Sequence, residues 1–220
     1  MFRTIQPEIL DSLPHDHPAA LRNRRDLRLI NFIMGAERWF ARALKRVSAP
    51  RDSILELGAG TGELGLSLSA AIGPVRYTGL DFWPRPPDWP DHWRWLQTDL
   101  LDFQNYASQS VVIGNLILHQ FTAEELAGIG QMMQQHARVI VFSEPARRKL
   151  HVWQIRLLAP FSLSAVAKHD ACVSIQAGFL GEELPMALGL DRRHWKWTVT
   201  TGFRGYYRMV AVRRSSSSRH

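Results

Sequence analysis

The chain has 220 residues and a formal net charge of +7. Its 45% hydrophobic and 21% charged residues exclude a disordered or fibrous chain and indicate a globular protein. The single cysteine, Cys172, excludes an internal disulfide and a cysteine zinc cluster, and it predicts a reducing, cytoplasmic compartment. We expect no membrane span, because no apolar run approaches roughly 20 residues. We also expect no secretion signal in Met1–Asp11.

The first 50 residues predict an arm followed by helices. Pro7, Pro14 and Pro18 punctuate the arm, where His15 and His17 are an incidental pair or, less favourably, metal ligands. Apolar residues then recur at helical spacing over 19–47, and Gly35 predicts a break between two helices. Asn31 and Arg38 could direct polar groups inward, but a plain core helix is the favoured reading.

The most informative stretch is Ser53–Gly65. A short apolar run ends in alternating glycines at Gly58, Gly60 and Gly62 and leads into helical periodicity. This pattern predicts a strand, a tight turn and a helix, the opening unit of a doubly wound α/β sheet. Glycine lets the backbone approach a ligand, and the helix beginning near Thr61 directs free amides and a positive dipole end towards that ligand.

Two acidic residues narrow the choice of ligand. Glu63 stands where the dinucleotide fingerprint has its third glycine, and Glu56 precedes the first glycine, so a pyrophosphate would be repelled. The next apolar run, Val75–Leu80, predicts a second strand ending at Asp81. The E-x-G-x-G-x-G pattern followed by this acid resembles motifs I and II of the class I S-adenosylmethionine-dependent methyltransferases.

This resemblance implies a doubly wound, seven-stranded, mostly parallel sheet with a reversed last strand, the Rossmann-like methyltransferase fold. It also implies S-adenosyl-L-methionine as the cofactor. Asp81 would accept the ribose hydroxyls, Phe82 would lie against adenine, and Asp99 (or its competitor Asp102) would reach the adenine amine. The expected cofactor-binding residues are Glu56, Gly58, Ala59, Gly60, Thr61, Gly62, Asp81, Phe82, Asp99, Leu100 and Asn115.

The run Ser110–Phe121 predicts a buried fourth strand with a polar exit. Its N-L-x-L-H-x-F segment is similar to one common in small-molecule methyltransferases, and it lacks the N-P-P-Y signature of many nucleic-acid methyltransferases. His119 would lie where cofactor and acceptor meet. His169, beside Asp170, is the second candidate base. The alternatives are a structural histidine in either position and catalysis by alignment alone.

The remaining elements follow from local signals. Thr122 and Glu125 form a capping box for a helix to about His136, and Arg138–Ser143 is the fifth strand. An apolar helix over 149–167, broken at Pro160, either is buried or lines an acceptor pocket. Two alternating runs over 195–200 and 206–212 predict a hairpin. Residues 82–95, rich in tryptophan and proline, are a pocket wall or a cover over the sheet edge.

We therefore expect one methyltransferase domain over 1–220. Its parts are an arm with cap helices (1–50), a cofactor half (51–145), an acceptor-binding insert (146–190), a hairpin (191–213) and a disordered tail (214–220). The apolar insert favours a small, fairly hydrophobic acceptor, such as a phenol or a polyketide-like compound of secondary metabolism. The basic charge supports an RNA methyltransferase as the runner-up, and a non-catalytic cofactor-binding module is the third reading. We expect no metal, and the sequence leaves the oligomeric state open.

Overall fold

The computed structural model describes residues 1–14, 17–73 and 76–215, with the backbone alone at residues 11, 24 and 158–162. His15, one half of the expected histidine pair, and most of the expected disordered tail (216–220) lie outside the described residues. The elements in chain order are η1 (Leu10–Ser12), α1 (Pro18–Met34), α2 (Ala36–Val47), β1 (Ser53–Leu57), α3 (Glu63–Ile72), β2 (Arg76–Asp81), β3 (Arg94–Gln97), β4 (Val111–Asn115), η2 (Leu118–Gln120), α4 (Ala123–His136), β5 (Val139–Pro145), α5 (Lys149–Ser162), α6 (Ala165–Ala177), α7 (Glu183–Ala187), β6 (Trp195–Thr201) and β7 (Tyr206–Arg213).

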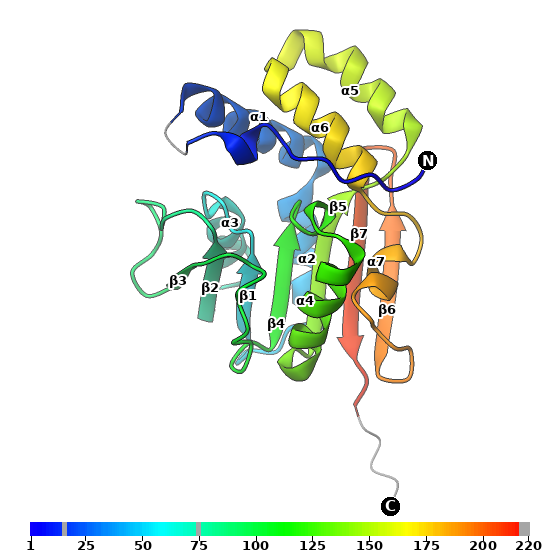
Figure 1. Cartoon of the computed structure of the whole chain (residues 1–220). Helices are drawn as coiled ribbons and strands as arrows, with labels where there is room; N and C mark the ends of the chain where they lie inside the picture. The colour runs from blue at the N-terminus through cyan, green and yellow to red at the C-terminus, as the bar shows by residue number, and fades with distance from the viewer. Residues whose placement is uncertain (15–16, 74–75, 216–220) are drawn as a thin grey trace, which may run out of the picture.

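A seven-stranded sheet in the order β3-β2-β1-β4-β5-β7-β6 forms the centre of the molecule (Figure 1). The first five strands in this order run parallel, and β7 is antiparallel to β5 and β6. The predicted mostly parallel sheet with a reversed last strand is therefore confirmed.

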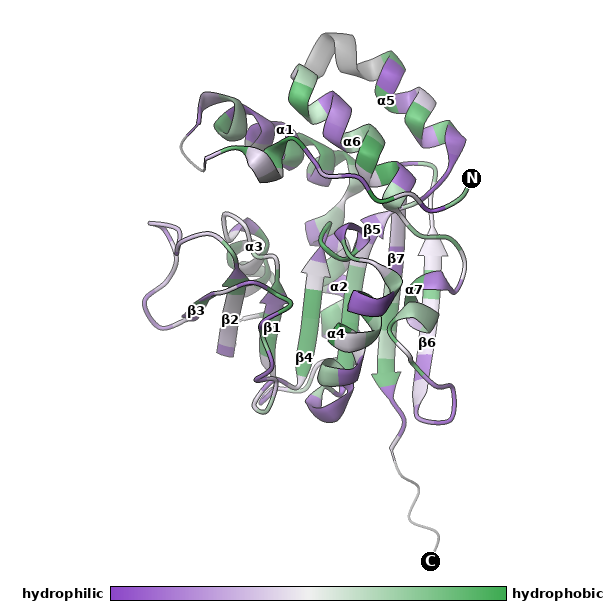
Figure 2. Cartoon of the chain, in the orientation of Figure 1, coloured by the Kyte–Doolittle hydropathy of each residue, from purple (hydrophilic) through white to green (hydrophobic). Residues whose placement is uncertain are grey.

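Helices cover both faces of the sheet. Phe40 and Leu44 of α2 and Leu68 of α3 pack on one face, whereas Leu126 of α4 and Leu184 of α7 pack on the other. Both faces of β4 and β5 are thus buried, which explains their continuous apolar sequences. Figure 2 shows the hydrophobic character of these central strands.

A separate group of helices lies above the carboxyl ends of the parallel strands. The arm, α1, α5 and α6 form this upper group in Figure 1. In a doubly wound sheet, ligands bind at this edge. The region before β1 and the insert after β5 therefore both face the edge where the glycine-rich turn lies.

Local capping signals explain most helix ends. Thr122 and Glu125 form both bonds of the predicted capping box on α4. Pro18 begins α1, and the ring nitrogen of His17 accepts a hydrogen bond from the backbone N–H of Ala19, so His17 acts as a cap. Gly35 has φ +65°, and this left-handed residue separates α1 from α2 as predicted.

The predicted break at Pro160 is wrong. Helix α5 continues through this residue to Ser162, and a second helix then begins at Ala165. Proline removes one backbone hydrogen-bond donor, but this loss does not stop α5, which continues for two residues beyond Pro160. The boundary is instead set by Ser164, whose hydroxyl accepts from the backbone N–H of Ala167 and caps α6.

The tryptophan- and proline-rich loop covers the sheet edge. Trp89 and Trp93 are buried and lie against Tyr77 of β2, with ring centroids 5.9 and 4.8 Å away, and Trp89 also contacts Trp95. Trp89 also lies against Gly62 of the glycine-rich turn, so the loop covers the sheet beside β3 and borders the turn as well, in keeping with both predicted alternatives.

Candidate active site

Three predicted residues meet at one level of the sheet. Strand register pairs Leu57 with Leu80 and with Gly114, so Gly58, Asp81 and Asn115 are the next residues on three neighbouring strands. The polar ends of β2 and β4 therefore flank the glycine-rich turn that follows β1.

The three glycines of the turn have left-handed backbones but different surroundings. Gly58, Gly60 and Gly62 have φ of +66°, +55° and +78°. A Cβ on Gly58 would lie 2.8 Å from Ile117, and one on Gly62 would lie 2.7 Å from Trp89. Gly60 alone of the three faces open space, so it is the position where the backbone is accessible to a ligand. The other two glycines are needed for packing.

Backbone amides hold the carboxylate of Asp81 in place. Its Oδ2 accepts from the N–H of Gly60 at 2.7 Å, and its Oδ1 accepts from the N–H of Trp83 at 2.9 Å. Asp81 is buried, and its contact with Gly60 places a fixed anion directly beside the open part of the turn. A carboxylate has about four acceptor sites, so such a group also suits ligand hydroxyls.

Glu56 is a second buried acid behind the turn. Its Oε2 accepts from the hydroxyl of Tyr77 at 2.8 Å. Burial, together with the charge of Asp81, raises the pKa of Glu56 to about 8 against the opposing effect of the Tyr77 bond. Glu56 is therefore largely protonated at neutral pH, and it does not present the anion that the sequence analysis assigned to it.

Helix α1 closes over the turn through two polar contacts. Asn115 donates from Nδ2 to Oδ1 of Asn31 at 3.0 Å, and Arg28 pairs with Glu63 at the start of α3 at 2.9 Å. The Oδ1 atom of Asn115 is buried and has no hydrogen-bond partner among the described residues. An unpaired acceptor beside the turn suits a donor group on a ligand.

The other predicted cofactor residues have mixed placements. Phe82 is 72% exposed. Asp99 is exposed and accepts from the N–H of Leu101 at 2.8 Å, whereas Leu100 is buried in the core. Ala59 is buried and donates its N–H to the carbonyl of Leu80, and Thr61 is half-buried. Leu100 therefore packs structurally, whereas Asp81 bonds directly to Gly60 of the turn.

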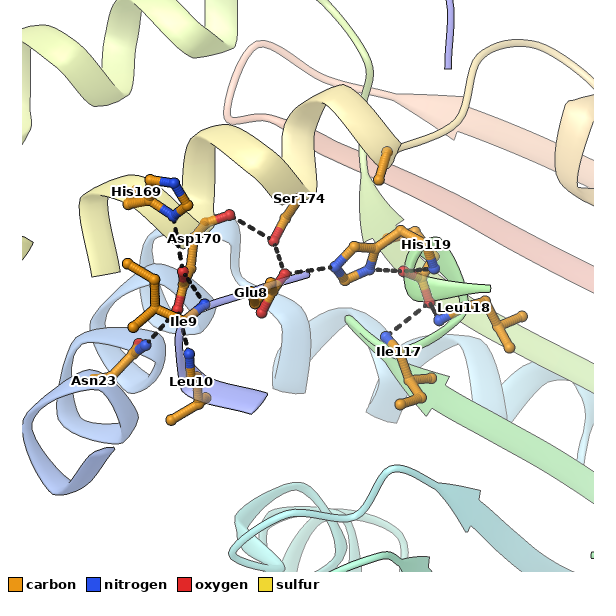
Figure 3. Close-up of polar contacts among 12 residues, drawn as sticks. Glu8, Ile9, Leu10, Asn23, Ile117, Leu118, His119, His169, Asp170 and Ser174 are labelled. Atoms are coloured by element: carbon orange, nitrogen blue, oxygen red, sulfur yellow. Dashed lines mark hydrogen bonds and ion pairs between the residues drawn. The ribbon is translucent and has the colours of Figure 1, made fainter. Parts of the chain in front are cut away.

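His119 lies between two carboxylates (Figure 3). Its Nδ1 is 2.8 Å from Glu144 Oε2, and its Nε2 is 3.2 Å from Glu8 Oε1. Glu144 also accepts from the backbone N–H groups of Ile117 and Leu118, at 3.2 and 2.9 Å. Burial alone would lower the pKa of His119, but the two carboxylates outweigh it and raise this pKa to about 9.

This geometry changes the role expected for His119. The ring is 2% exposed, and both nitrogens already bond to acids. An imidazole with a pKa of about 9 is a cation at neutral pH and does not accept a further proton. In this arrangement His119 joins the arm to the end of β5 rather than presenting a free base.

The second candidate base lies on α6 and contacts its neighbour in sequence. His169 Nδ1 is 3.2 Å from Asp170 Oδ1, and the His169 side chain is half exposed. Asp170 is buried and accepts from the backbone N–H groups of Ile9 and Leu10, at 2.8 and 3.1 Å, and from Asn23 at 2.9 Å. Asp170 therefore primarily holds the arm and α1 against α6 (Figure 3).

Polar contacts also hold the beginning of the arm. Arg3 donates to the backbone carbonyls of Ala177, His119 and Phe121, at 2.8, 3.0 and 2.8 Å. The carbonyl of Met1 accepts from Arg147. The hydroxyl of Ser174 donates a hydrogen bond to Glu8. Burial would raise the pKa of Glu8, but the hydrogen bond to His119 and the charge of His119 together lower it below its usual value.

No sequence pattern assigned a role to Glu8, Glu144 or Ser174. Glu144 ends a fully buried strand, the same signal that identified Asp81, and could have been found in that way. Glu8 lies 111 residues from His119 in a proline-rich arm, and no local pattern predicts their contact.

Two features are absent from the described part of the chain. No group of three or more histidine, cysteine or acidic side chains in residues 1–14, 17–73 and 76–215 could hold a metal ion. Across the same residues, no helix has the length and apolarity needed to cross a membrane.

Comparison with known proteins identifies the fold. Scans of protein-family models and of curated proteins give no match. Among solved structures, the plantazolicin methyltransferase BpumL, in complex with SAH, matches 94% of this chain and 93% of its own, with a TM-score of 0.72 at 13% identity. The chain has the class I methyltransferase fold.

Two further structures share the methyltransferase fold. The pyocyanin biosynthetic protein PhzM matches 80% of this chain and 54% of its own, with a TM-score of 0.56 at 15% identity. Magnesium protoporphyrin IX methyltransferase (ChlM) from Synechocystis PCC 6803, with bound SAM, matches 88% and 84%, with a TM-score of 0.52 at 14% identity. The methyltransferase fold of this chain carries its glycine-rich turn and Asp81 at the edge where that fold binds ligands.

Proposed function

We propose that this protein is an S-adenosylmethionine-dependent methyltransferase that acts on a small, fairly hydrophobic acceptor. One observation carries the proposal: the anchored carboxylate of Asp81 lies beside the one open glycine of the turn, Gly60. The similarity to BpumL in complex with SAH and to ChlM with bound SAM supports the same cofactor.

The residues at the turn fit this cofactor. Asp81 would accept from the ribose hydroxyls, Gly60 would allow close approach of the ligand, and the unpaired Oδ1 of Asn115 would accept a donor on it. When bound, the cofactor supplies an electrophilic methyl group. The protein's part is to align the acceptor and exclude water, which α1 and the arm are positioned to do.

A base is needed only for an acceptor that holds its proton at neutral pH, such as a phenol. His119 is engaged by Glu8 and Glu144, so we assign it to positioning and retain His169 as the candidate base for such an acceptor. The acceptor class rests on the apolar residues of the insert that are not exposed, such as Val152, Ile155 and Val173. Two structural neighbours support it: BpumL is a plantazolicin methyltransferase and PhzM is a pyocyanin biosynthetic protein. The single cysteine favours a cytoplasmic location.

Calorimetry tests the cofactor. We expect S-adenosylmethionine and its demethylated product to bind and NAD not to bind. Asp81→Ala should weaken binding by about 1.5–3 kcal/mol, or about 10- to 150-fold, the range for hydrogen bonds to a charged group. Asp88→Ala is the matched control, because Asp88 is an exposed acid in the loop after β2 and is not among the expected cofactor-binding residues, and we expect a smaller loss. Tight NAD binding, or unchanged affinity in Asp81→Ala, would contradict the proposal.

The net charge of +7 favours RNA as the alternative acceptor. Binding through several phosphates would weaken steeply with salt, with a slope of roughly −0.7 per contact on single strands. We expect weak RNA association without sequence preference and no methyl transfer to RNA from labelled cofactor. Label in one discrete RNA species would replace the small-molecule proposal with the RNA alternative.

A further inference from the structure

Helix α5 has an apolar face directed away from the rest of the protein. Leu150, Trp153 and Leu157 follow one another at helical spacing and are 54%, 62% and 66% exposed. The other side of the helix holds it in place: His151 is buried, and Gln154 donates to the carbonyl of Phe203 in the β6–β7 turn. Packing among the described residues therefore leaves three large apolar side chains in water.

The surroundings of this face are positively charged. Lys149 and Arg156 are exposed and flank the apolar row on the α5 helix, and we call these five residues the docking face. No aspartate or glutamate occurs between Glu144 and Asp170. Bands of polar and apolar residues alternate along α5 in Figure 2. Phe203, 71% exposed, and Arg204 extend the same combination into the adjacent turn.

Charge and composition select the occupant of the docking face. A second copy of α5 would bring lysine and arginine against like charges, which is unfavourable. An anionic lipid surface complements the cations, and tryptophan and leucine insert at the boundary of headgroup and acyl chain. A helix of 14 residues is about 21 Å long and too short to cross a bilayer, so it would lie in the interface.

We propose that α5 docks this protein on anionic lipid membranes through the docking face. The helix would lie parallel to the membrane, with Leu150, Trp153 and Leu157 at the acyl boundary and Lys149 and Arg156 at the phosphates. This surface is separate from the glycine-rich turn, so docking and cofactor binding can be measured independently.

Co-sedimentation with vesicles tests the docking face. The full chain is mixed with vesicles of phosphatidylglycerol and phosphatidylcholine, or of phosphatidylcholine alone. We expect binding to the anionic vesicles, at least about ten-fold tighter than to the neutral ones. Lys149→Gln with Arg156→Gln should weaken this binding about 25-fold, since each cation near an anionic surface contributes about five-fold. Trp153→Gln with Leu157→Gln should weaken it by at least about ten-fold.

Lys45→Gln with Arg46→Gln is the matched control, because it removes one exposed lysine and one exposed arginine from α2. We expect it to bind vesicles within about two-fold of the unchanged chain. Equal losses in the control and the docking-face variant, equal binding to both kinds of vesicle, or no sedimentation at all would each overturn the proposal. The proposal would also be overturned if light scattering showed that the unchanged chain is a dimer, that Trp153→Gln with Leu157→Gln abolishes this dimer, and that vesicle binding is unaffected by these changes. Calorimetry with S-adenosylhomocysteine should be unchanged in every variant, which separates failure of this proposal from failure of the proposed function.

Discussion

Replacing His119 with alanine is expected to lower the free energy of unfolding by about 3–5 kcal/mol at pH 6, because removing one partner of a buried ion pair leaves the other charge without compensation. Glu144, 0% exposed, would lose its cationic partner, and Glu8 would lose its anchor. Urea denaturation at fixed pH measures the change. His169→Ala is the control, because this half-exposed ring contributes less than about 1 kcal/mol.

The effect of His119→Ala should depend on pH in a defined direction. The pKa of His119 is raised from 6.5 to about 9, so its contribution to stability is complete below pH 6.5 and is lost as the pH rises through 9. The difference between the unchanged chain and the variant should therefore shrink by roughly 3 kcal/mol between pH 6 and 10. A constant difference across this range would show that His119 is held neutral.

Replacing Glu56 with glutamine is expected to stabilise the protein at pH 8.5 and to have little effect at pH 4.5. Burial raises the pKa of Glu56 from 4.5 to about 8, so the folded state holds a proton that the unfolded state releases in this range. The stability of the unchanged chain should fall by about 1.4 kcal/mol per pH unit from this group, or roughly 4 kcal/mol in all. Glutamine keeps an acceptor for the hydroxyl of Tyr77 without the ionisation.

Denaturation of both proteins at several pH values between 4.5 and 8.5 measures this contribution. Asp81→Asn is not a suitable control, because Asp81 holds the turn itself. Asp99→Asn is suitable, because Asp99 is exposed. Parallel pH profiles for Glu56→Gln and the unchanged chain would show that Glu56 is ionised throughout.

Most of the fold is predictable from local sequence because its signals are local. The apolar run before Gly58 forms the predicted strand, over Ser53–Leu57, since a buried parallel strand has a continuous apolar sequence that here ends at glycine. The α4 helix has the predicted Thr122 cap and ends at His136. The prediction at Pro160 was wrong because a proline removes only one hydrogen bond, which α5 tolerates near its end. The start of α6 is instead set by the cap residue Ser164.

The site is predictable only where strand order determines it. Asp81 and Asn115 follow from their places at the ends of β2 and β4, and the structure puts both beside the turn. The pKa of Glu56 depends on how deeply Tyr77 and its neighbours bury it, which no spacing reveals. The raised pKa of His119 likewise depends in part on Glu8, which lies in the N-terminal arm, 111 residues away. A contact between side chains so far apart in sequence leaves no periodic pattern that could predict it.

The anchored arm has a practical consequence for preparing the protein. The carbonyl of Met1 accepts a hydrogen bond from Arg147, and Arg3 bonds to the carbonyls of His119 in η2 and Ala177 in α6. An affinity tag fused before Met1 would extend directly from this fastened segment and compete with it for space above the sheet edge. Strand β7 ends at Arg213, at the opposite end of the molecule in Figure 1. A tag after the last residue therefore leaves the arm, Glu8 and the edge of the sheet undisturbed.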